Sequence, residues 1–339
     1  MAPDVQPEWQ EGTEVLTYQF GSWVLGRWTF SSLINRTNPL IQHTQPVDIP
    51  AALRPITYQQ MRDDGTISST ICFTGNNVRY VPYHGTRYFI DLRPRSFNEY
   101  LSKFSSKSRN TLKRKLRQFA DRSEGKIDFR IYTSPDDVIE FRRQALKVST
   151  LSYQNSIGFG IPESPQFETH LLEESAKGRM CGFVLFGSNT PVAYVFCRVD
   201  QGIVTYSYCG YDPEFAKLSP GTVLLFLIVE WLFREGKFKI FDLGNDSWGY
   251  KAALATGGVK YFKVIWFPKT AANLIMIGIH IAVLRAWFGA ARVRKIITPW
   301  SNSGRTALRS IVARMTDVKA HRAEVVTLPN GVTHRRVSK

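Results

Sequence analysis

The sequence predicts a mixed α+β fold, with a mostly antiparallel sheet that contains one parallel strand pair and is flanked by helices. Residues 180–213, "MCGFVLFGSNTPVAYVFCRVDQGIVTYSYCGYDP", form three consecutive strand patterns with turn residues at Gly187–Pro191 and Asp200–Gly202. Residues 203–243 then follow the order strand, helix, strand. Such a unit makes its two strands parallel, with a right-handed crossover between them.

The N-terminal residues 1–95 are rich in Trp, Tyr, Gly and Pro and contain alternating runs such as "TYQFGSWVLGRW". Alternation between frequent turn residues is typical of short strands, so we expect a β-rich region. Residues 97–122 combine basic residues and helix formers with apolar residues at helical spacing, which predicts two helices. The apolar positions are Leu101, Phe104, Leu112, Leu116 and Phe119.

The next segment begins a regular alternation of strands and helices. "KIDFRIY" at 126–132 predicts a strand, and Pro135 then opens a helix that continues to about Thr150. A second helix is expected over 166–178, ending at Gly178.

A long apolar helix follows the three strands. Ser219 is placed to be its N-cap, Pro220 its first residue and Gly236 the residue just past its end. Because this helix is apolar on nearly all sides, we expect it to be buried. "KFKIFDLG" predicts another strand, "SWGYKAALAT" a short helix and "GVKYFKVIWFP" a final strand. We therefore expect three regions: β-rich 1–95, a mixed-sheet domain over 96–268, and a basic helical tail over 269–339.

The formal net charge of +16 is concentrated in two segments. Residues 103–117 carry seven Lys/Arg and no acid, and residues 285–339 carry twelve Lys/Arg and two acids. A polyanion or an anionic surface is the natural partner of such segments. For 103–117 no aromatic stacking positions interleave the cations, which favours an anionic substrate or a membrane surface over nucleic acid. A solvated helix face is the alternative.

The four cysteines show no CxxC spacing, which predicts free thiols in a reducing compartment and neither a disulfide framework nor a metal site. The N-terminal "MAPDVQPEWQEG" lacks a hydrophobic signal region, so we expect a cytoplasmic protein. The apolar runs 222–233 and 274–284 are shorter than a bilayer span.

Residues 271–295, "AANLIMIGIHIAVLRAWFGAARVRK", predict an apolar helix followed by cations, with Trp287 and Phe288 between them. This order is typical of an interfacial helix on an anionic membrane, here at the inner face. Packing on the protein's own sheet is the alternative.

The helix that starts at Ser219, Pro220, Gly221 and Thr222 offers free N–H groups and its positive dipole end to an anion such as a pyrophosphate. Lys217 would add charge to this site. A good helix start with no ligand is the alternative.

The strand "KIFDLG" is parallel to "TYSYCG", so its carboxyl end emerges beside the same helix start. Asp242, Asp246, Tyr250 and Lys251 gather at that edge. Crevices at the carboxyl ends of parallel strands are favoured ligand sites, and we expect these side chains to line the mouth of an anion-binding cleft.

Residues 97–268 resemble the GNAT acyltransferase superfamily, and more closely its CelD-like branch, the cellulose-biosynthesis acetyltransferase type, which is related to the Fem aminoacyltransferases. Three blocks carry the resemblance by order and spacing: "SSKSRNTLKRKLRQF", "YCGYDPEFAKLSPGTVLLFLIVEWLFREG" and "IFDLGNDSWGYKAAL". The chain departs from the superfamily in its phosphate loop, which has fewer glycines than usual.

The resemblance implies that acyl-CoA, as a cosubstrate and not a bound cofactor, lies between two splayed parallel strands. Its pyrophosphate would meet Ser219–Thr222. Its thioester carbonyl would meet a backbone N–H near Cys209, Gly210 and Tyr211, which would stabilise the oxyanion. Tyr250 occupies the place of the acid in many GNAT enzymes, and Asp242 or Asp246 would be the base. Lys251 matches a lysine near the substrate in Fem relatives.

Each of these residues has a structural alternative. The Tyr250 ring would pack, Lys251 and Asp246 would be solvated, and Asp242 would pair with an internal cation. The expected activity is transfer of an acyl group, acetyl above all, from CoA to an amine such as an amino sugar or a polysaccharide precursor. The alternatives are a Fem-like transferase that uses aminoacyl-tRNA, and a non-catalytic scaffold that binds a membrane or a polyanion.

Overall fold

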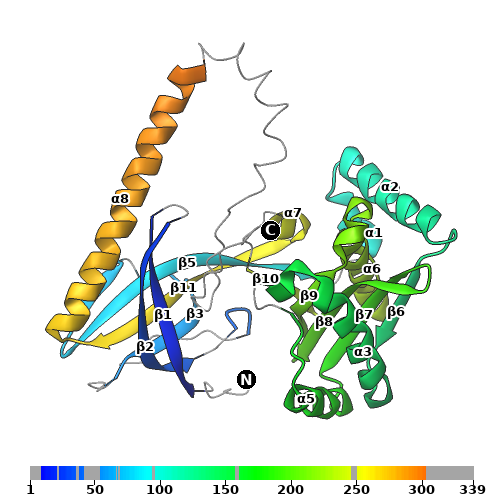
Figure 1. Cartoon of the computed structure of the whole chain (residues 1–339), viewed down its shortest axis with the longest axis horizontal. Helices are drawn as coiled ribbons and strands as arrows, with labels where there is room; N and C mark the ends of the chain where they lie inside the picture. The colour runs from blue at the N-terminus through cyan, green and yellow to red at the C-terminus, as the bar shows by residue number, and fades with distance from the viewer. Residues whose placement is uncertain are drawn as a thin grey trace. The chain divides into compact units, whose positions relative to one another are not determined.

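A computed structural model describes residues 9–302 except 21–22, 36–37, 42–53, 66, 68, 94–95, 157–159 and 246–249. The chain divides into two compact units. Unit 1 comprises Met1–Thr86 and Val259–Lys339, and unit 2 comprises Arg87–Gly258. Figure 1 shows the elements of both units with their labels.

Unit 1 is built on a sheet in the order β1-β2-β3-β11-β5, with β4 paired to β5. β1 and β2 are antiparallel, β2 and β3 are parallel, and β3 and β11 are antiparallel. The strands are β1 (Trp9–Phe20), β2 (Trp23–Asn35), β3 (Ile56–Arg62), β4 (Ile71–Thr74), β5 (Asn77–Asp91) and β11 (Gly257–Pro268). The β2–β3 pair is a second parallel pair, beyond the one that the sequence predicts.

Helix α8 (Ala271–Asn302) packs on this sheet beside β1 (Figure 1). Ile277 of α8 is buried with Leu16, Tyr80 and Phe267 in one core cluster. The expected three-part division therefore differs from the structure, because α8 and β11 complete the core of the unit that begins with β1. The contact favours the alternative considered for this helix, packing on the protein's own sheet.

Unit 2 carries a sheet in the order β5-β10-β9-β8-β7-β6. β6 to β9 are antiparallel neighbours, and β9 and β10 are parallel, as the sequence predicts. The strands are β6 (Asp128–Tyr132), β7 (Met180–Gly187), β8 (Thr190–Asp200), β9 (Ile203–Tyr211) and β10 (Ile240–Asn245). The protein thus has the predicted mixed fold with an open, mostly antiparallel sheet.

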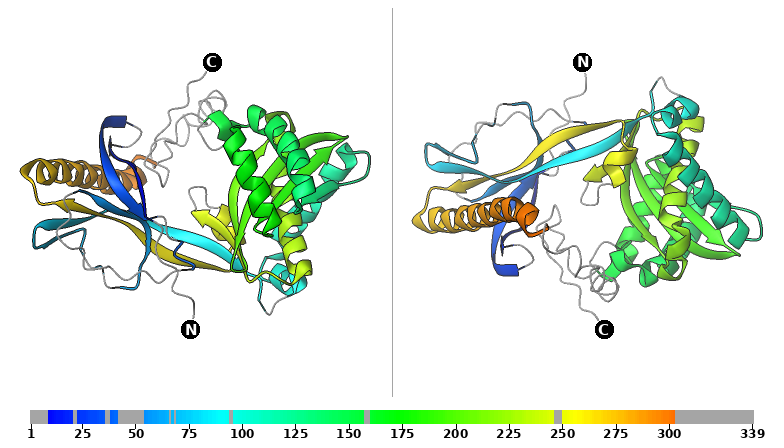
Figure 2. Two further views of the ribbon diagram at one scale, coloured as in Figure 1. Left: turned by 90° about the horizontal axis from the view of Figure 1, so that it is seen from below. Right: turned by 90° about the horizontal axis from the view of Figure 1, so that it is seen from above.

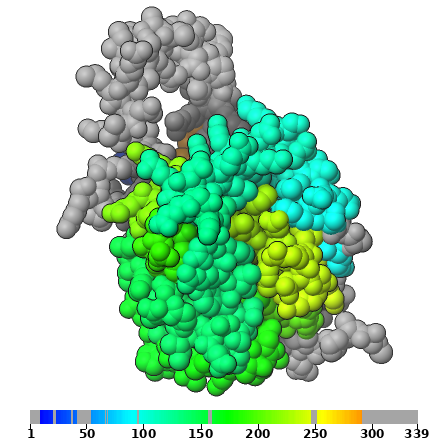
Figure 3. Space-filling view, turned by 90° about the vertical axis from the view of Figure 1, so that its right-hand side faces the viewer, coloured from blue at the N-terminus to red at the C-terminus, as the bar shows by residue number. Residues whose placement is uncertain are grey.

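Helices cover both faces of the unit 2 sheet (Figure 2). β7 is buried along its whole length, and its alternate residues enter two different cores: Phe183 packs with α6, and Val184 packs with α3 and α5. The helices are α1 (Phe97–Ser102), α2 (Ser106–Arg122), α3 (Pro135–Leu151), α4 (Tyr153–Ser156), α5 (Pro165–Ala176), α6 (Pro220–Glu235) and α7 (Tyr250–Leu254). In Figure 3, atoms in the colours of α2 and α3 occupy much of the visible face.

Helix α6 confirms the predicted boundaries. Ser219 is its N-cap, Pro220 its first residue, and Gly236 ends it with a φ of 65°. Eight residues of α6 are buried, which agrees with its apolar sequence. This buried helix holds its N-terminus firmly next to the carboxyl end of β9.

Candidate active site

The parallel strands β9 and β10 stay paired over a short distance only. Their register runs from Ile240↔Ile203 to Asp242↔Thr205, while β9 continues to Tyr211 and β10 to Asn245. Beyond Thr205, β9 keeps its pairing with β8 on the other side. The two parallel strands therefore part after Asp242. The part of β9 that follows Thr205 has one edge without a strand partner among the described residues.

An ion pair is buried at the point where the strands part. The Asp242 carboxylate is 0% exposed and accepts hydrogen bonds from Arg87 Nε at 2.9 Å and Arg87 Nη2 at 2.6 Å. The Gly244 N–H and the Thr205 hydroxyl donate to the same carboxylate, at 2.9 and 3.3 Å. These contacts favour the structural alternative for Asp242, pairing with an internal cation, over a role as the base.

The open edge of β9 presents backbone donors. The Asp212 N–H donates to Val192 O on β8 at 2.9 Å, and the β8 register continues through Gly210↔Tyr194. Because N–H groups alternate in direction along a strand, those of Cys209 and Tyr211 point away from β8, to the open edge. Such fixed donors suit an oxygen that gains negative charge during a reaction.

The start of α6 faces the same edge. Ser219 has a φ of 53°, a left-handed conformation that is uncommon for non-glycine residues. The N–H groups of Thr222 and Val223 donate to Ser219 O, at 3.0 and 3.1 Å. Pro220 has no N–H, so the first N–H of the helix belongs to Gly221. This N–H comes too early in the helix to have an acceptor within it.

Space is open at Gly221. A Cβ atom built there would meet no atom closer than Tyr211 Cδ1, at 3.9 Å. A ligand can therefore approach the backbone, and a larger side chain would occupy the ligand's place without disturbing the core.

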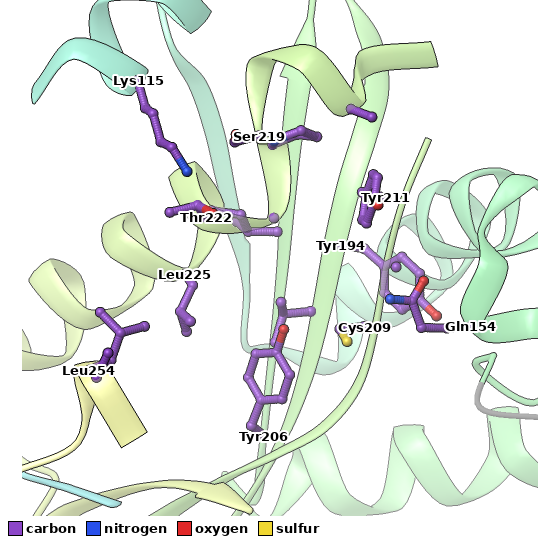
Figure 4. A pocket seen from close by; sticks show the side chains of 17 residues that line it. Lys115, Gln154, Tyr194, Tyr206, Cys209, Tyr211, Ser219, Thr222, Leu225 and Leu254 are labelled. Carbon is purple, nitrogen blue, oxygen red and sulfur yellow. The ribbon is translucent and has the colours of Figure 1, made fainter. Parts of the chain in front are cut away.

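These features enclose a pocket of about 500 Å³, within the range of small-molecule sites. Figure 4 shows its lining side chains. The lining residues from β9 and α6 include seven that the sequence predicts as cofactor-binding: Cys209, Gly210, Tyr211, Ser219, Pro220, Gly221 and Thr222. Ala253 and Leu254 of α7 complete another side of the pocket.

The cation of the pocket differs from the expected one. Lys217 is exposed and is not among the lining residues, whereas Lys115 of α2 is (Figure 4). The basic run 103–117 signalled an anionic partner but could not single out Lys115. Helical periodicity shows which residues share a face of α2, and not which face meets the pocket.

Gln154 is a further lining residue that sequence reasoning missed. It comes from α4, an element that was not predicted, and its Oε1 atom is buried with no hydrogen-bond partner among the described residues. A ligand or a water molecule in the pocket could donate a hydrogen bond to this oxygen.

The predicted catalytic residues after β10 are placed in part. Tyr250 begins α7, one turn before Leu254, and Asp246 lies outside the described residues. Lys251 donates from Nζ to Asn245 O at 3.0 Å, and its Nζ lies 5.7 Å from the centroid of Tyr206, a pocket-lining ring. Lys251 is thus half-buried next to a pocket-lining ring, although it is not itself among the lining residues.

Burial controls the protonation of two lining groups. It raises the pKa of the Cys209 thiol, so this thiol stays protonated at neutral pH and is a poor nucleophile. It also raises the pKa of Tyr194 to about 12, and the Tyr194 hydroxyl accepts from the Ile161 N–H at 3.2 Å.

Among the residues that the structure describes, no group of three or more His, Cys, Asp or Glu is placed to hold a metal ion.

One family model is similar to this region of the chain. The model of the acetyltransferase (GNAT) domain matches residues 106–252. No curated protein is a significant match to the chain.

Solved structures with a similar fold are remote in sequence. The C-terminal domain (DUF2156) of a putative lysylphosphatidylglycerol synthetase from Agrobacterium fabrum is 13% identical, with 68% of this chain and 72% of that chain covered and a TM-score of 0.45. FemX is 9% identical, with 79% and 90% covered and a TM-score of 0.46. A GCN5-related N-acetyltransferase from Kribbella flavida is 8% identical, with 57% and 62% covered and a TM-score of 0.32. These likenesses are too remote to indicate an activity.

The family match spans the basic helix α2, the diverging strands and the start of α6, which are the elements that build the pocket. Residues 106–252 are therefore similar to GNAT-type acetyltransferase domains.

Proposed function

We propose that the protein is an N-acyltransferase that moves an acyl group, acetyl in the simplest case, from CoA to an amine. The observation that carries this proposal is the pocket between the open edge of β9 and the start of α6. One end of the pocket offers donors for an anion, and the strand edge offers donors for a carbonyl oxygen. A thioester joined to a pyrophosphate needs both.

The donor would bind with its pyrophosphate at the Gly221 N–H, where the helix dipole and the open space favour an anion. Lys115 would neutralise part of the phosphate charge from the side of α2. Gln154 has an unpaired amide oxygen that would accept from an amide N–H of the donor's chain.

In the proposed reaction, the amine attacks the thioester carbonyl carbon and the C–S bond breaks. The N–H groups of Cys209 and Tyr211 would stabilise the oxyanion. The amine loses one proton, and the departing thiolate gains one; we propose Tyr250 as the acid and Asp246 as the base. Direct transfer is favoured over an acyl-cysteine, because the pKa of the Cys209 thiol is raised. Lys251 would position the acceptor from beside the pocket.

The three sequence blocks lead us to propose further that the enzyme belongs to the CelD-like branch and acts on an amino sugar or a polysaccharide precursor. Aminoacyl-tRNA is a second candidate donor, favoured by the exposed cations of α2, such as Lys113 and Arg117. Two assays separate the two donors: one supplies aminoacyl-tRNA without CoA, and the other supplies acetyl-CoA without tRNA. The assay that yields product identifies the donor.

Binding of acetyl-CoA measured by calorimetry tests the placement. Gly221→Glu should abolish binding, because the new carboxylate enters the phosphate position. Gly278→Glu is the control, since a Cβ built at Gly278 of α8 likewise has open space and meets no atom within 4 Å. Unchanged affinity of the Gly221 variant would overturn the placement.

Lys115, the cation that lines the pocket, is tested with one variant and one matched control. Lys115→Gln should lower the affinity about tenfold, the loss expected when a charge-assisted hydrogen bond is removed. Lys107→Gln, on an exposed residue of the same helix, should leave the affinity unchanged.

With thiol release and an amine library as the assay, Tyr250→Phe should slow turnover without altering donor binding. A protein that releases no thiol with any amine, yet binds the donor, would contradict the enzymatic role.

A further inference from the structure

An exposed apolar surface lies at one end of unit 1, far in sequence from the pocket residues. At the start of β2, the side chain of Trp23 is 74% exposed and that of Leu25 is 59% exposed, with Val24 between them at 40%. These residues follow the turn of the β1–β2 hairpin. Three consecutive exposed apolar residues, one of them Trp, are costly to leave in water and indicate a contact surface.

Helix α8 extends this surface. The Phe20 ring at the end of β1 meets the Trp287 ring edge-to-face, with centroids 5.4 Å apart. Phe288, the next residue of α8, is 63% exposed. Figure 1 shows the hairpin and α8 running alongside each other. We call the surface formed by Phe20, Trp23, Val24, Leu25, Trp287 and Phe288 the apolar tip.

The charges around the apolar tip have one sign. Residues 15–35 and 271–316 contain no Asp or Glu. Arg27 on β2 and Arg285 on α8 are exposed. Arg292, Arg294 and Lys295 follow in the sequence of the same helix. An apolar surface that carries two Trp residues and exposed Arg side chains complements the boundary of an anionic bilayer, where Trp lies at headgroup level and Arg or Lys meets phosphate.

A spanning role for α8 fits less well. Its segment Ala271–Ala290 has a mean hydropathy of 1.6, long and apolar enough to cross a bilayer by length and composition alone. This segment is longer than the apolar run 274–284, and 11% of it is buried. However, its buried residues include Ile277, 1% exposed, and His280, 5% exposed, because both face the sheet. His280 is hydrogen-bonded to Thr17 O at 3.1 Å and to the Tyr80 hydroxyl.

A helix bonded to a sheet in this way cannot enter hydrocarbon without bringing strand edges with it, and open strand edges are not tolerated there. The attachment to the sheet therefore favours a surface contact.

We propose that the apolar tip inserts into the interfacial region of an anionic lipid bilayer and holds the protein at that surface. The cations supply long-range attraction that salt screens, and the aromatic and aliphatic side chains supply insertion. Membrane binding through unit 1 does not require the donor pocket of unit 2, so the full chain binds vesicles with or without acyl-CoA.

Flotation of the full chain with lipid vesicles tests the proposal. We expect binding to vesicles of phosphatidylglycerol mixed with phosphatidylcholine, weak binding to phosphatidylcholine alone, and release by high salt or alkaline carbonate. The double variant Trp23→Ser/Leu25→Ser should bind at least about tenfold more weakly, because two inserting side chains are lost. Ile139→Ser is the control, since Ile139 of α3 is 62% exposed but lies in unit 2.

A second variant, Phe288→Ser, changes the helix side of the same surface and should also weaken binding. Both variants should keep the melting temperature of the parent protein, because the changed side chains are exposed. Full-strength binding by the tip variants, or equal binding to neutral vesicles, would overturn the proposal. So would retention after carbonate, which indicates a spanning helix, or a dimer in solution that the tip variants dissociate, which assigns the surface to a second copy.

Discussion

The buried Arg87–Asp242 pair allows a test of what holds the two parallel strands apart at the pocket. Arg87→Met removes the hydrogen bonds that Arg87 donates and leaves a carboxylate that is 0% exposed without its cation. Breaking a buried pair in this way costs about 3–5 kcal/mol. For a unit of this length each 1 kcal/mol lowers the melting temperature by about 2–4 °C, so we expect a fall of about 6–20 °C.

Urea denaturation followed by circular dichroism gives the loss of stability, and hydrogen exchange read by mass spectrometry locates it. Exchange should rise first in β9 and β10, where the pair lies. Arg130→Met is the control: the Arg130–Asp128 pair lies in the same unit but is 45% and 38% exposed, and such pairs contribute about 0–1 kcal/mol.

The double variant Arg87→Met/Asp242→Leu should recover part of the loss, because no unpaired charge is left buried. A loss below about 1 kcal/mol for Arg87→Met, or strictly additive losses in the double variant, would refute the assignment of Asp242 as a structural anchor.

Other contacts give independent tests. Burial lowers the pKa of His280 below its ordinary value of about 6.5, so the unfolded chain binds the proton more readily; the contribution of His280 is complete above that pH and is lost as the pH falls. Denaturation of wild type and His280→Gln across this range should show a steeper acid-side loss for wild type, and equal slopes would contradict it. Burial raises the pKa of Cys181 to about 12, so iodoacetamide should modify the half-buried Cys72 first, as peptide mass spectrometry would show; early Cys181 labelling would argue against this core. Lys263→Met should destabilise unit 1 by about 3–5 kcal/mol in urea denaturation, because Lys263 is the buried partner of Glu14, and an unchanged free energy of unfolding would contradict this.

The order of elements in unit 2 follows from local sequence signals. Caps and breakers such as Pro135, Pro220 and Gly236 fix helix ends through backbone geometry, which depends on neighbouring residues alone. The alternation of residues 180–213 fixes the meander in the same way. These signals explain why the strand–helix–strand unit and the pocket residues along β9 and α6 were predictable.

Features that depend on distant contacts were not predictable. The partner of Asp242 is Arg87, 155 positions away, and no periodicity links them. Lys115 enters the pocket because of how α2 packs on α6, whereas Lys217, closer in sequence to the helix start, is exposed. The second parallel pair, β2 with β3, joins segments whose connection carries no strand or helix signal in the sequence.

The division of the chain has a consequence for synthesis. Unit 1 is split by the 87–258 insert, so its first strands leave the ribosome long before β11 and α8, which cover Leu16 and Tyr80. At about 5–20 residues per second, the insert alone occupies on the order of ten to thirty seconds. Unit 2, the insert, is therefore able to fold first. Until β11 and α8 have been synthesised, the apolar faces of β1 to β5 remain exposed to water. During that interval the nascent chain is a natural client for a chaperone, and its yield in cells should depend on translation speed more than the stability of the finished protein would indicate.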